Sequence, residues 1–147
     1  MYKRIILAYD GSASGQKALL GIKDLAHWER PHLTLVAVDP LVSMGVAAVD
    51  MGYLHSTNPT ASEHSLKEQL REGVETLRTM GFEADGELLK GEVIREVTRY
   101  ATEQGADLIV VGHKHEKNLL RRWWSSSHAK SLVEEAPCNV LIVVHKV

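Results

Sequence analysis

The stretch that decides the fold runs Asp107-Leu-Ile-Val-Val-Gly-His-Lys-His-Glu-Lys-Asn-Leu-Leu-Arg-Arg-Trp-Trp-Ser-Ser-Ser-His128. Residues 108 to 112 are apolar or glycine, which is typical of a strand buried on both faces of a parallel sheet. A polar, basic loop then leads to three serines, which open an apolar-periodic segment and are expected at the first turn of a helix. Because the first amides of a helix lack internal partners, this arrangement predicts a binding site for an anion.

On both sides of this stretch, apolar runs alternate with segments of helical spacing. Strands are predicted over Arg4 to Tyr9, Leu33 to Val38, Phe82 to Leu89, Leu108 to Val111 and Val140 to Val144. Helices are predicted around Ala18 to Ala26, from about Thr60 to Met80, over Ile94 to Ala101 and from near Ser126 to Ala136. Gly81 and Gly105 are expected to end the second and third of these helices.

Strands that alternate with helices in this order predict an α/β fold. Their crossovers place the strands parallel in one sheet with helices on both faces. We therefore expect a single Rossmann-like, doubly wound domain with a five-stranded parallel sheet over residues 1–147. In such folds ligands bind beyond the carboxyl ends of the strands, where the winding reverses. The loops that begin at Asp10 and Gly112 fit that position best.

Composition and charge are those of an ordinary globular protein. The chain has 147 residues, is 44% hydrophobic and 24% charged, and carries a formal net charge of -2. That charge argues against a general nucleic-acid or membrane-surface binder, and no stretch is long and apolar enough to span a bilayer. The single cysteine, Cys138, is expected in the core, permits no intrachain disulfide and favours a reducing compartment, so a cytoplasmic location is expected.

Short motifs are spread over the whole chain in a fixed order. They are Ile6-Leu-Ala-Tyr-Asp-Gly-Ser12, Leu35-Val-Ala-Val-Asp-Pro40, Gly91-Glu-Val-Ile94, Ala106-Asp-Leu-Ile-Val-Val-Gly-His113, Ser125-Ser-Ser127 and Ala136-Pro-Cys-Asn-Val-Leu-Ile-Val143. In this order and spacing the chain resembles the universal stress protein family, as one such domain over residues 1–147. The resemblance implies a five-stranded parallel α/β domain that is commonly dimeric through its last strand. It also implies a role in stress survival and, in one branch, binding of ATP or a related adenine nucleotide.

The nucleotide-binding branch of that family carries the motif Gly-x2-Gly-x9-Gly-[Ser/Thr] after the fourth strand. Gly112 matches the first glycine and Ser126 the final position, whereas His115 and Ser125 replace the second and third glycines. Glycine lets the backbone approach a phosphate closely and adopt a positive φ. A Cβ at position 115 or 125 is therefore expected to narrow the phosphate cradle or to redirect its amides.

The resemblance also implies contacts at the other end of the nucleotide. Asp10 matches a position near the ribose and adenine, and Ala37 matches one whose backbone contacts adenine. The expected ligand is ATP or AMP with Mg²⁺, and no cofactor is required for folding. The predicted nucleotide-binding residues lie at strand ends and in the loop before the last helix, and are Ala8, Asp10, Ala37, Val111, Gly112, His115, Arg121, Arg122, Ser125, Ser126 and Ser127.

The segment from His113 to Arg122 is locally basic in an acidic protein. Its charges are expected to form charge-assisted bonds to phosphate in place of the lost glycine amides, or else only to keep a solvated loop soluble. Trp123 and Trp124 adjoin this segment. They are suited to stacking on adenine, to anchoring a partner surface, or to pinning the loop onto its own domain.

The last predicted strand is apolar at every position although an edge location is expected for it. An exposed apolar edge promotes aggregation unless something covers it. A two-fold related copy that presents the same strand would cover it, and burial by helices within one subunit is the alternative. We predict a homodimer through this strand, with interface residues Val140, Leu141, Ile142, Val143 and Val144.

Signals for catalysis and for metal binding are weak. The sequence has no nucleophile elbow, zinc motif or P-loop, so no catalytic residue is predicted. His113, His115 and His128 have no cysteine or carboxylate partner at matching spacing, so no metal site is predicted. Two alternatives to a nucleotide-binding regulator stay open: a dimeric module that binds an unknown protein and no nucleotide, and a weak ATPase or nucleotide-transfer enzyme.

Overall fold

The computed structural model describes residues 2–9, 21, 30–39, 59–114 and 126–145. The predicted helix at Ala18 to Ala26, apart from residue 21, lies outside this part of the chain. The described elements alternate as predicted, and are β1 (Arg4–Ala8), β2 (His32–Asp39), α4 (Pro59–Thr79), β3 (Glu83–Lys90), α5 (Val93–Gln104), β4 (Leu108–Lys114), α6 (Ser126–Glu135) and β5 (Asn139–His145).

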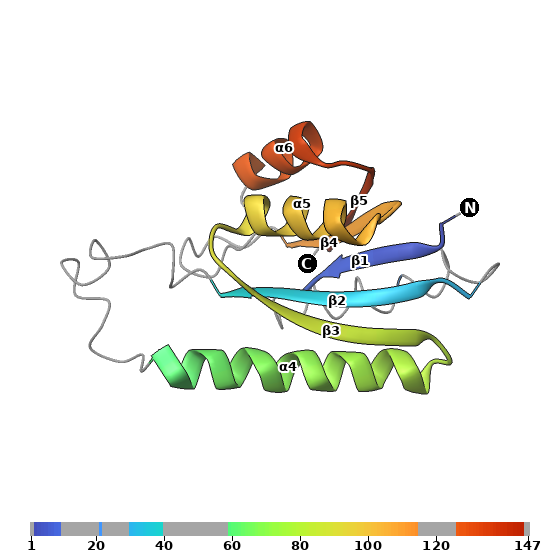
Figure 1. Ribbon diagram of the computed structural model, residues 1–147, viewed down its shortest axis with the longest axis vertical. Coiled ribbons are helices and arrows are strands. Elements are labelled where there is room, and N and C mark those ends of the chain that lie inside the picture. The colour runs from blue at the N-terminus through green and yellow to red at the C-terminus, as the bar shows by residue number, and fades with distance from the viewer. Residues whose placement is uncertain (1, 10–20, 22–29, 40–58, 115–125, 146–147) are drawn as a thin grey trace.

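The strands form one parallel sheet in the order β3-β2-β1-β4-β5 (Figure 1). β1 lies in the centre, where Ala8 is in register with Val36 of β2 on one side and with Val111 of β4 on the other. The chain therefore winds from β1 outward to β3, and then returns to add β4 and β5 on the opposite side. The predicted five-stranded, doubly wound α/β fold is confirmed.

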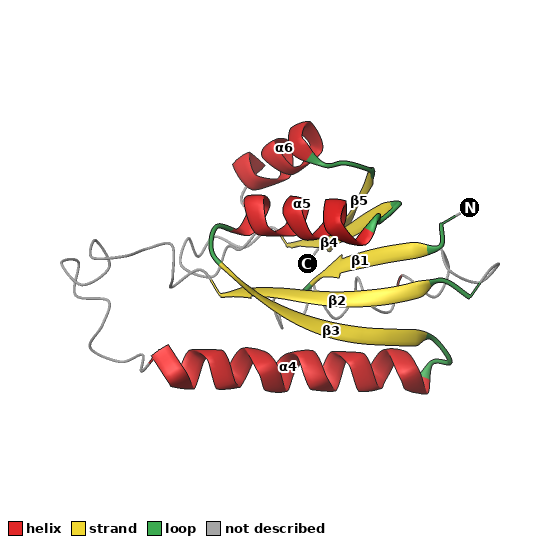
Figure 2. Cartoon of the chain, in the orientation of Figure 1, coloured by secondary structure: helices red, strands yellow, loops and turns green. Residues whose placement is uncertain are grey.

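Helices lie on both faces of the sheet and bury two separate apolar clusters (Figure 2). On one face, Leu77 of α4 is fully buried against the sheet. On the other face, Val97 of α5 and Leu132 of α6 are also fully buried. Successive residues of a strand point to opposite faces, so the continuous apolar runs of β1 and β4 supply both clusters.

The helix ends follow from glycine chemistry and from one acidic cap. Gly81, with φ 91°, follows α4, and Gly105, with φ 59°, caps α5. These left-handed conformations strain residues that carry a Cβ, so the two glycines end the helices as predicted. At the start of α5, the Glu92 carboxylate accepts hydrogen bonds from the amides of Ile94 and Arg95 at 3.0 and 2.8 Å.

Asp107 ties the start of β4 to the start of β1. Its carboxylate accepts hydrogen bonds from the Lys3 and Arg4 amides at 2.8 and 3.1 Å, and its own amide donates to the Arg4 carbonyl at 3.0 Å. These bonds set the register of the two central strands at their amino ends. The same register pairs Ala8, the last residue of β1, with Val111, and β4 continues beyond this level to Lys114.

One predicted boundary was wrong. We predicted that the fourth strand ends at Val111 and that a loop begins at Gly112, but β4 continues to Lys114. Gly112, His113 and Lys114 are in register with residues 143 to 145 of β5. Pairing with a neighbouring strand satisfies the backbone of these residues, so they remain in the sheet although the apolar run has ended.

Candidate functional site

The carboxyl ends of β1 and β4 lie side by side in the middle of the sheet. The connection from β1 leads toward β2 and the connection from β4 leads toward β5, so the winding direction reverses between these two strands. Neighbouring loops diverge at such a point and leave a crevice, which is where open α/β sheets bind ligands. The chain leaves β1 after Ala8 and β4 after Lys114 on this side of the sheet, where the sequence predicted the two loops.

Four predicted nucleotide-binding residues are described with their surroundings, and all four are buried. The exposed fractions of Ala8, Ala37 and Val111 are 5%, 2% and 1%, and Gly112 is also buried. Ala8 and Val111 belong to the cluster under α5 and α6, whereas Ala37 belongs to the cluster under α4. Because these side chains are small and buried, the groups they can offer to a ligand are backbone amides and carbonyls at the strand ends.

Two of the three consecutive serines lie where the sequence predicted them, at the start of the last helix. Ser126 is the first residue of α6 and Ser127 the second. α6 connects β4 with the parallel strand β5, so it starts on the side of the sheet where the strands have their carboxyl ends. The first amides of α6 have no partners within the helix, and the positive end of the helix dipole lies there. An anion is favoured at this position.

Five predicted nucleotide-binding residues lie outside the described part of the chain: Asp10, His115, Arg121, Arg122 and Ser125. The same holds for the tryptophan pair 123–124. Asp10 directly follows Tyr9, whose amide still donates to the Val36 carbonyl of β2 at 2.8 Å. His115 likewise follows Lys114 at the end of β4. The roles of these side chains stay predictions.

The last strand forms an edge of the sheet, as expected, and its apolar side chains are only half-buried. Leu141 and Val143 pack at the margin of the cluster under α4, and Val140 and Ile142 at the margin of the cluster under α5 and α6. Val144 is described by its backbone, in register with His113. Within the chain, these four half-buried side chains keep part of their apolar surface exposed.

Cys138 is half-buried beside the cluster under α5 and α6. Burial raises the pKa of its thiol, and the nearby negative charge of Asp107 raises it further. A raised pKa lowers the fraction of reactive thiolate at neutral pH. These surroundings agree with the packing role expected from the sequence.

Two further expectations can be compared with the described residues. No group of three or more His, Cys, Asp or Glu side chains is placed to hold a metal ion within the ranges that the structure describes. Among the helices described, none is long and apolar enough to cross a membrane.

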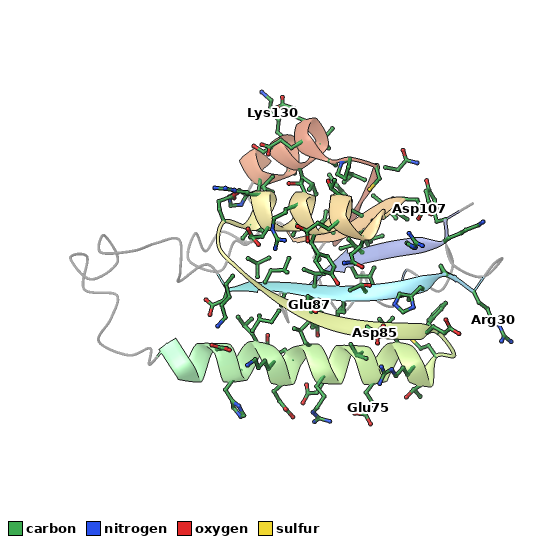
Figure 3. The ribbon with its side chains drawn as sticks, in the orientation of Figure 1. Arg30, Glu75, Asp85, Glu87, Asp107 and Lys130 are labelled. Atoms are coloured by element: carbon green, nitrogen blue, oxygen red, sulfur yellow. The ribbon has the colours of Figure 1, made fainter. Side chains whose placement is uncertain are left out.

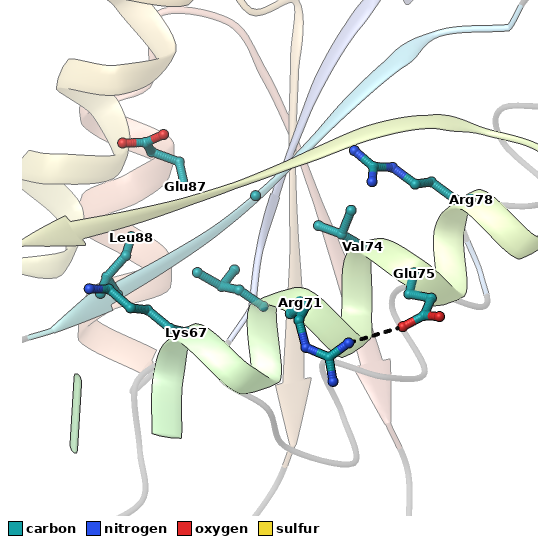
Figure 4. Close-up of a pocket in the computed structure, with 9 residues that line it drawn as sticks. Lys67, Arg71, Val74, Glu75, Arg78, Glu87 and Leu88 are labelled. Atoms are coloured by element: carbon teal, nitrogen blue, oxygen red, sulfur yellow. Dashed lines mark hydrogen bonds and ion pairs between the residues drawn. The ribbon is translucent and has the colours of Figure 1, made fainter. Parts of the chain in front are cut away.

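Two cavities that the sequence did not predict flank the edge strand β3. One, of about 840 Å³, lies between β3 and α4 and is lined by Leu70, Val74 and Leu88, among others (Figure 4). The other, of about 440 Å³, lies on the opposite face of β3 and is lined by Asp85, Glu87 and other residues of the sheet and α5. One sequence pattern could have predicted that the two faces of β3 differ in chemistry. It is the alternation of charged residues with small or apolar ones in Glu83-Ala-Asp-Gly-Glu-Leu-Leu-Lys90.

Comparison with known proteins yields a consistent set of relatives. A family model described as "Universal stress protein family" matches residues 1–144. The stress response protein NhaX of Bacillus subtilis is 27% identical over 161 residues, which cover 95% of this chain and 96% of that protein.

Solved structures share the same fold over nearly their whole length. The universal stress protein UspA from Lactobacillus plantarum superimposes with a TM-score of 0.72 at 22% identity, covering 97% of each chain. The universal stress protein from Archaeoglobus fulgidus, in a structure described as a complex with dAMP, has a TM-score of 0.67 at 21% identity. The match covers 97% of this chain and 98% of that one.

Proposed function

Because the chain belongs to the universal stress protein family, we propose that it is a regulatory protein of the cytoplasmic stress response that binds an adenine nucleotide. The proposed site is the crevice between the loops that follow β1 and β4. The ligand is ATP or AMP, with Mg²⁺ accompanying ATP. Binding changes the contacts that the dimer makes with a partner protein.

The observation that carries this proposal is the placement of β1 and β4 at the reversal point of the sheet, with α6 starting on the side where their carboxyl ends lie. Backbone groups at the ends of β1, β2 and β4 can contact a flat base and a ribose, because the side chains of Ala8, Ala37 and Val111 are small or buried. The first amides of α6 can receive the phosphate. A relative with this fold is described in complex with dAMP, which supports the ligand class.

The basic loop compensates for the two missing glycines in this proposal. Arg121 and Arg122 are the residues that we expect to contact the phosphate, since charged donors form stronger hydrogen bonds than backbone amides. His115 and Ser125 narrow the cradle in the same segment. The balance between these two effects decides the affinity.

We also propose that the protein is a homodimer through β5. The supporting observation is the half-buried apolar row Val140, Leu141, Ile142 and Val143 at the sheet edge. A two-fold copy of the same strand removes this surface from water and pairs the open backbone row. Val144, the fifth predicted interface residue, continues the same strand.

Isothermal titration of the purified protein with ATP-Mg²⁺ and with AMP tests the nucleotide proposal, after extraction has shown that no nucleotide co-purifies. Micromolar binding is expected. Absence of binding at millimolar ligand would contradict the proposal and favour the alternative of an interaction module without nucleotide. Release of ADP or phosphate during the titration would instead favour the weak ATPase.

A double variant separates the basic loop from general charge effects. Arg121→Ala with Arg122→Ala should weaken ATP binding about tenfold and flatten its salt dependence, because two charge-assisted contacts are lost. The matched control is Arg71→Ala with Arg99→Ala, which removes the same charge from the exposed faces of α4 and α5. Equal losses in both double variants would show that only net charge matters.

A further inference from the structure

The edge strand β3 has an open row of backbone groups on the side away from β2. The amide of Gly91, just after β3, donates to the Asp39 carbonyl of β2 at 3.0 Å. The backbone N–H and C=O groups of the odd-numbered residues of β3 therefore point toward β2. The N–H and C=O of one residue in a strand point to the same side, and they alternate along the strand. The backbone groups of Ala84, Gly86 and Leu88 therefore point outward.

Only the first part of this outward row is covered. The Arg78 guanidinium of α4 donates from Nε to the Ala84 carbonyl at 2.9 Å and closes that end of the edge. Further along, the outward backbone groups of Gly86 and Leu88 form no hydrogen bond with any of the described residues. A short window around these two residues is thus open for pairing with another strand.

The two sides of this window differ in chemistry. Toward α4, the groove of about 840 Å³ has Leu88, Val74 and Leu70 at its base, and the glycine at 86 adds no side chain to fill it. Figure 4 shows Leu88 and Val74 in this groove, with Glu87 directed to the other side of β3. A side chain that enters the groove meets apolar atoms at its base and the stems of Lys67 and Arg71 at its rim.

The opposite side of β3 is acidic. Glu83, Asp85 and Glu87 alternate with the groove-facing residues and are exposed (Figure 3 labels Asp85 and Glu87). Asp85 pairs with His32 at 2.9 Å and with Arg78 at 3.4 Å, whereas Glu83 and Glu87 have no ion-pair partner within the described part of the chain. The adjoining cavity of about 440 Å³ is also lined by Tyr100 and Glu103 of α5.

The negative charge of these carboxylates affects the pKa of the phenol of nearby Tyr100. Burial raises the pKa of its phenol, and the negative charges of Glu87, Asp85 and Glu103 raise it further. Arg4 and His32 also line the cavity, so a cation is favoured beside Glu87, which has no ion-pair partner among the described residues, and the cavity leaves room for a long basic side chain.

We infer that the edge of β3 accepts an extended segment of a partner protein in which lysine or arginine alternates with apolar residues. The segment adds to the sheet by bonding to the outward groups of Gly86 and Leu88. Its apolar side chains enter the groove against α4, and its basic side chains reach Glu87 and the acidic cavity. Strand addition of this kind takes affinity from backbone bonds and specificity from alternate side chains.

Fluorescence anisotropy with a labelled synthetic peptide of alternating lysine and valine tests this inference. The control peptide has the same composition with its lysines and valines in two separate blocks. The alternating peptide should bind at least about tenfold more tightly, because only it matches both faces of β3 at once. Equal binding of the two peptides, or no binding of either, would overturn the inference.

Two variants locate the bound peptide. Gly86→Pro removes an outward N–H and also adds a Cβ about 3.1 Å from Val74 Cγ2 in the groove, so it should abolish binding. Glu87→Lys should weaken binding about fivefold to tenfold, since an attraction becomes a repulsion. The matched control is Glu72→Lys, the same charge change on the exposed face of α4, which should leave binding unchanged. If Glu72→Lys and Glu87→Lys weaken peptide binding equally, the effect comes from the net charge of the protein alone. That result would overturn the proposed site.

Amide hydrogen exchange provides a readout that does not depend on any variant. Added alternating peptide should slow exchange at Gly86 and Leu88, and unchanged exchange at these amides in the bound state would refute strand addition. If a second copy of this chain binds the same edge instead, the protein should form assemblies larger than a dimer without any peptide. Gly86→Pro should then dissociate these assemblies. That outcome would also overturn the inference.

Discussion

β3 and β5 are the two outer strands of one parallel sheet, and their exposed side chains differ sharply. β3 alternates charged residues with small or apolar ones, and Arg78 covers one of its outward carbonyls. β5 is apolar at four consecutive described positions, 140 to 143, each half-buried. An edge that is apolar on both faces suits a second copy of itself, whereas an edge with one acidic and one apolar face suits a segment of different composition.

The largest effect is expected from a charge on the apolar edge. Ile142→Lys should weaken the proposed dimer more than about thirtyfold, because a central interface residue contributes about 2 kcal/mol or more. Sedimentation velocity should show monomers, or the protein should become insoluble. The control is Leu88→Lys, which changes a half-buried aliphatic residue on the other edge strand and should leave the dimer intact. A normal dimer for Ile142→Lys would refute the role of β5.

A smaller effect is expected where α4 covers the edge of β3. Arg78→Ala removes the hydrogen bond to the Ala84 carbonyl and the 3.4 Å contact with Asp85. The free energy of unfolding in urea should fall by about 1 kcal/mol. Arg71→Ala is the control, because Arg71 pairs with Glu68 and Glu75 of its own helix. If both variants lose the same stability, Arg78 has no special role at the edge.

The smallest effect is expected at the other end of β3, where Glu63 joins α4 to the strand. Hydrogen bonds from Lys67 and then Lys90 lower the pKa of Glu63 from 4.5 to about 2. A carboxylate with a lowered pKa in the folded state stabilises the fold above its ordinary pKa, and this contribution is lost as the pH falls from 4.5 toward 2.

Glu63→Gln should therefore reduce stability at pH near 7 but not near 2. Urea unfolding at several pH values measures the difference between the variant and the unchanged protein. Glu134→Gln serves as the control, since its partner Lys130 is 3.8 Å away on the exposed face of the same helix. A stability difference for Glu63→Gln that does not change with pH would contradict the ion-pair explanation.

Much of the fold could be predicted because local patterns encode it. Apolar runs, and an imperfect alternation of apolar and polar residues in β3, marked every described strand to within a residue or two, except at the end of β4. Gly81 and Gly105 marked helix ends, because the conformations needed there favour glycine. The family resemblance, carried by motifs from Ile6 to Val143, is confirmed by the match over residues 1–144.

The sequence predicted where the candidate site lies better than it predicted how the side chains of the site are arranged. The order of elements indicated the crevice between the loops after β1 and β4, and the structure places the two strand ends next to each other. It also shows that the side chains of Ala8 and Ala37 face opposite sides of the sheet. The side chains expected to contact phosphate follow the end of β4, outside the described residues.

The sequence by itself determined the alternation of strands and helices, the parallel sheet and the family, since hydrophobic period and turn residues act over a few neighbouring positions. Only the tertiary structure decided that β3 forms the second edge, how far β4 extends, and that Arg78 closes one end of β3 while Gly86 stays open. These features depend on contacts between residues far apart in the chain. No local pattern specifies such contacts, because the pairing energy of a strand depends on its neighbour in space.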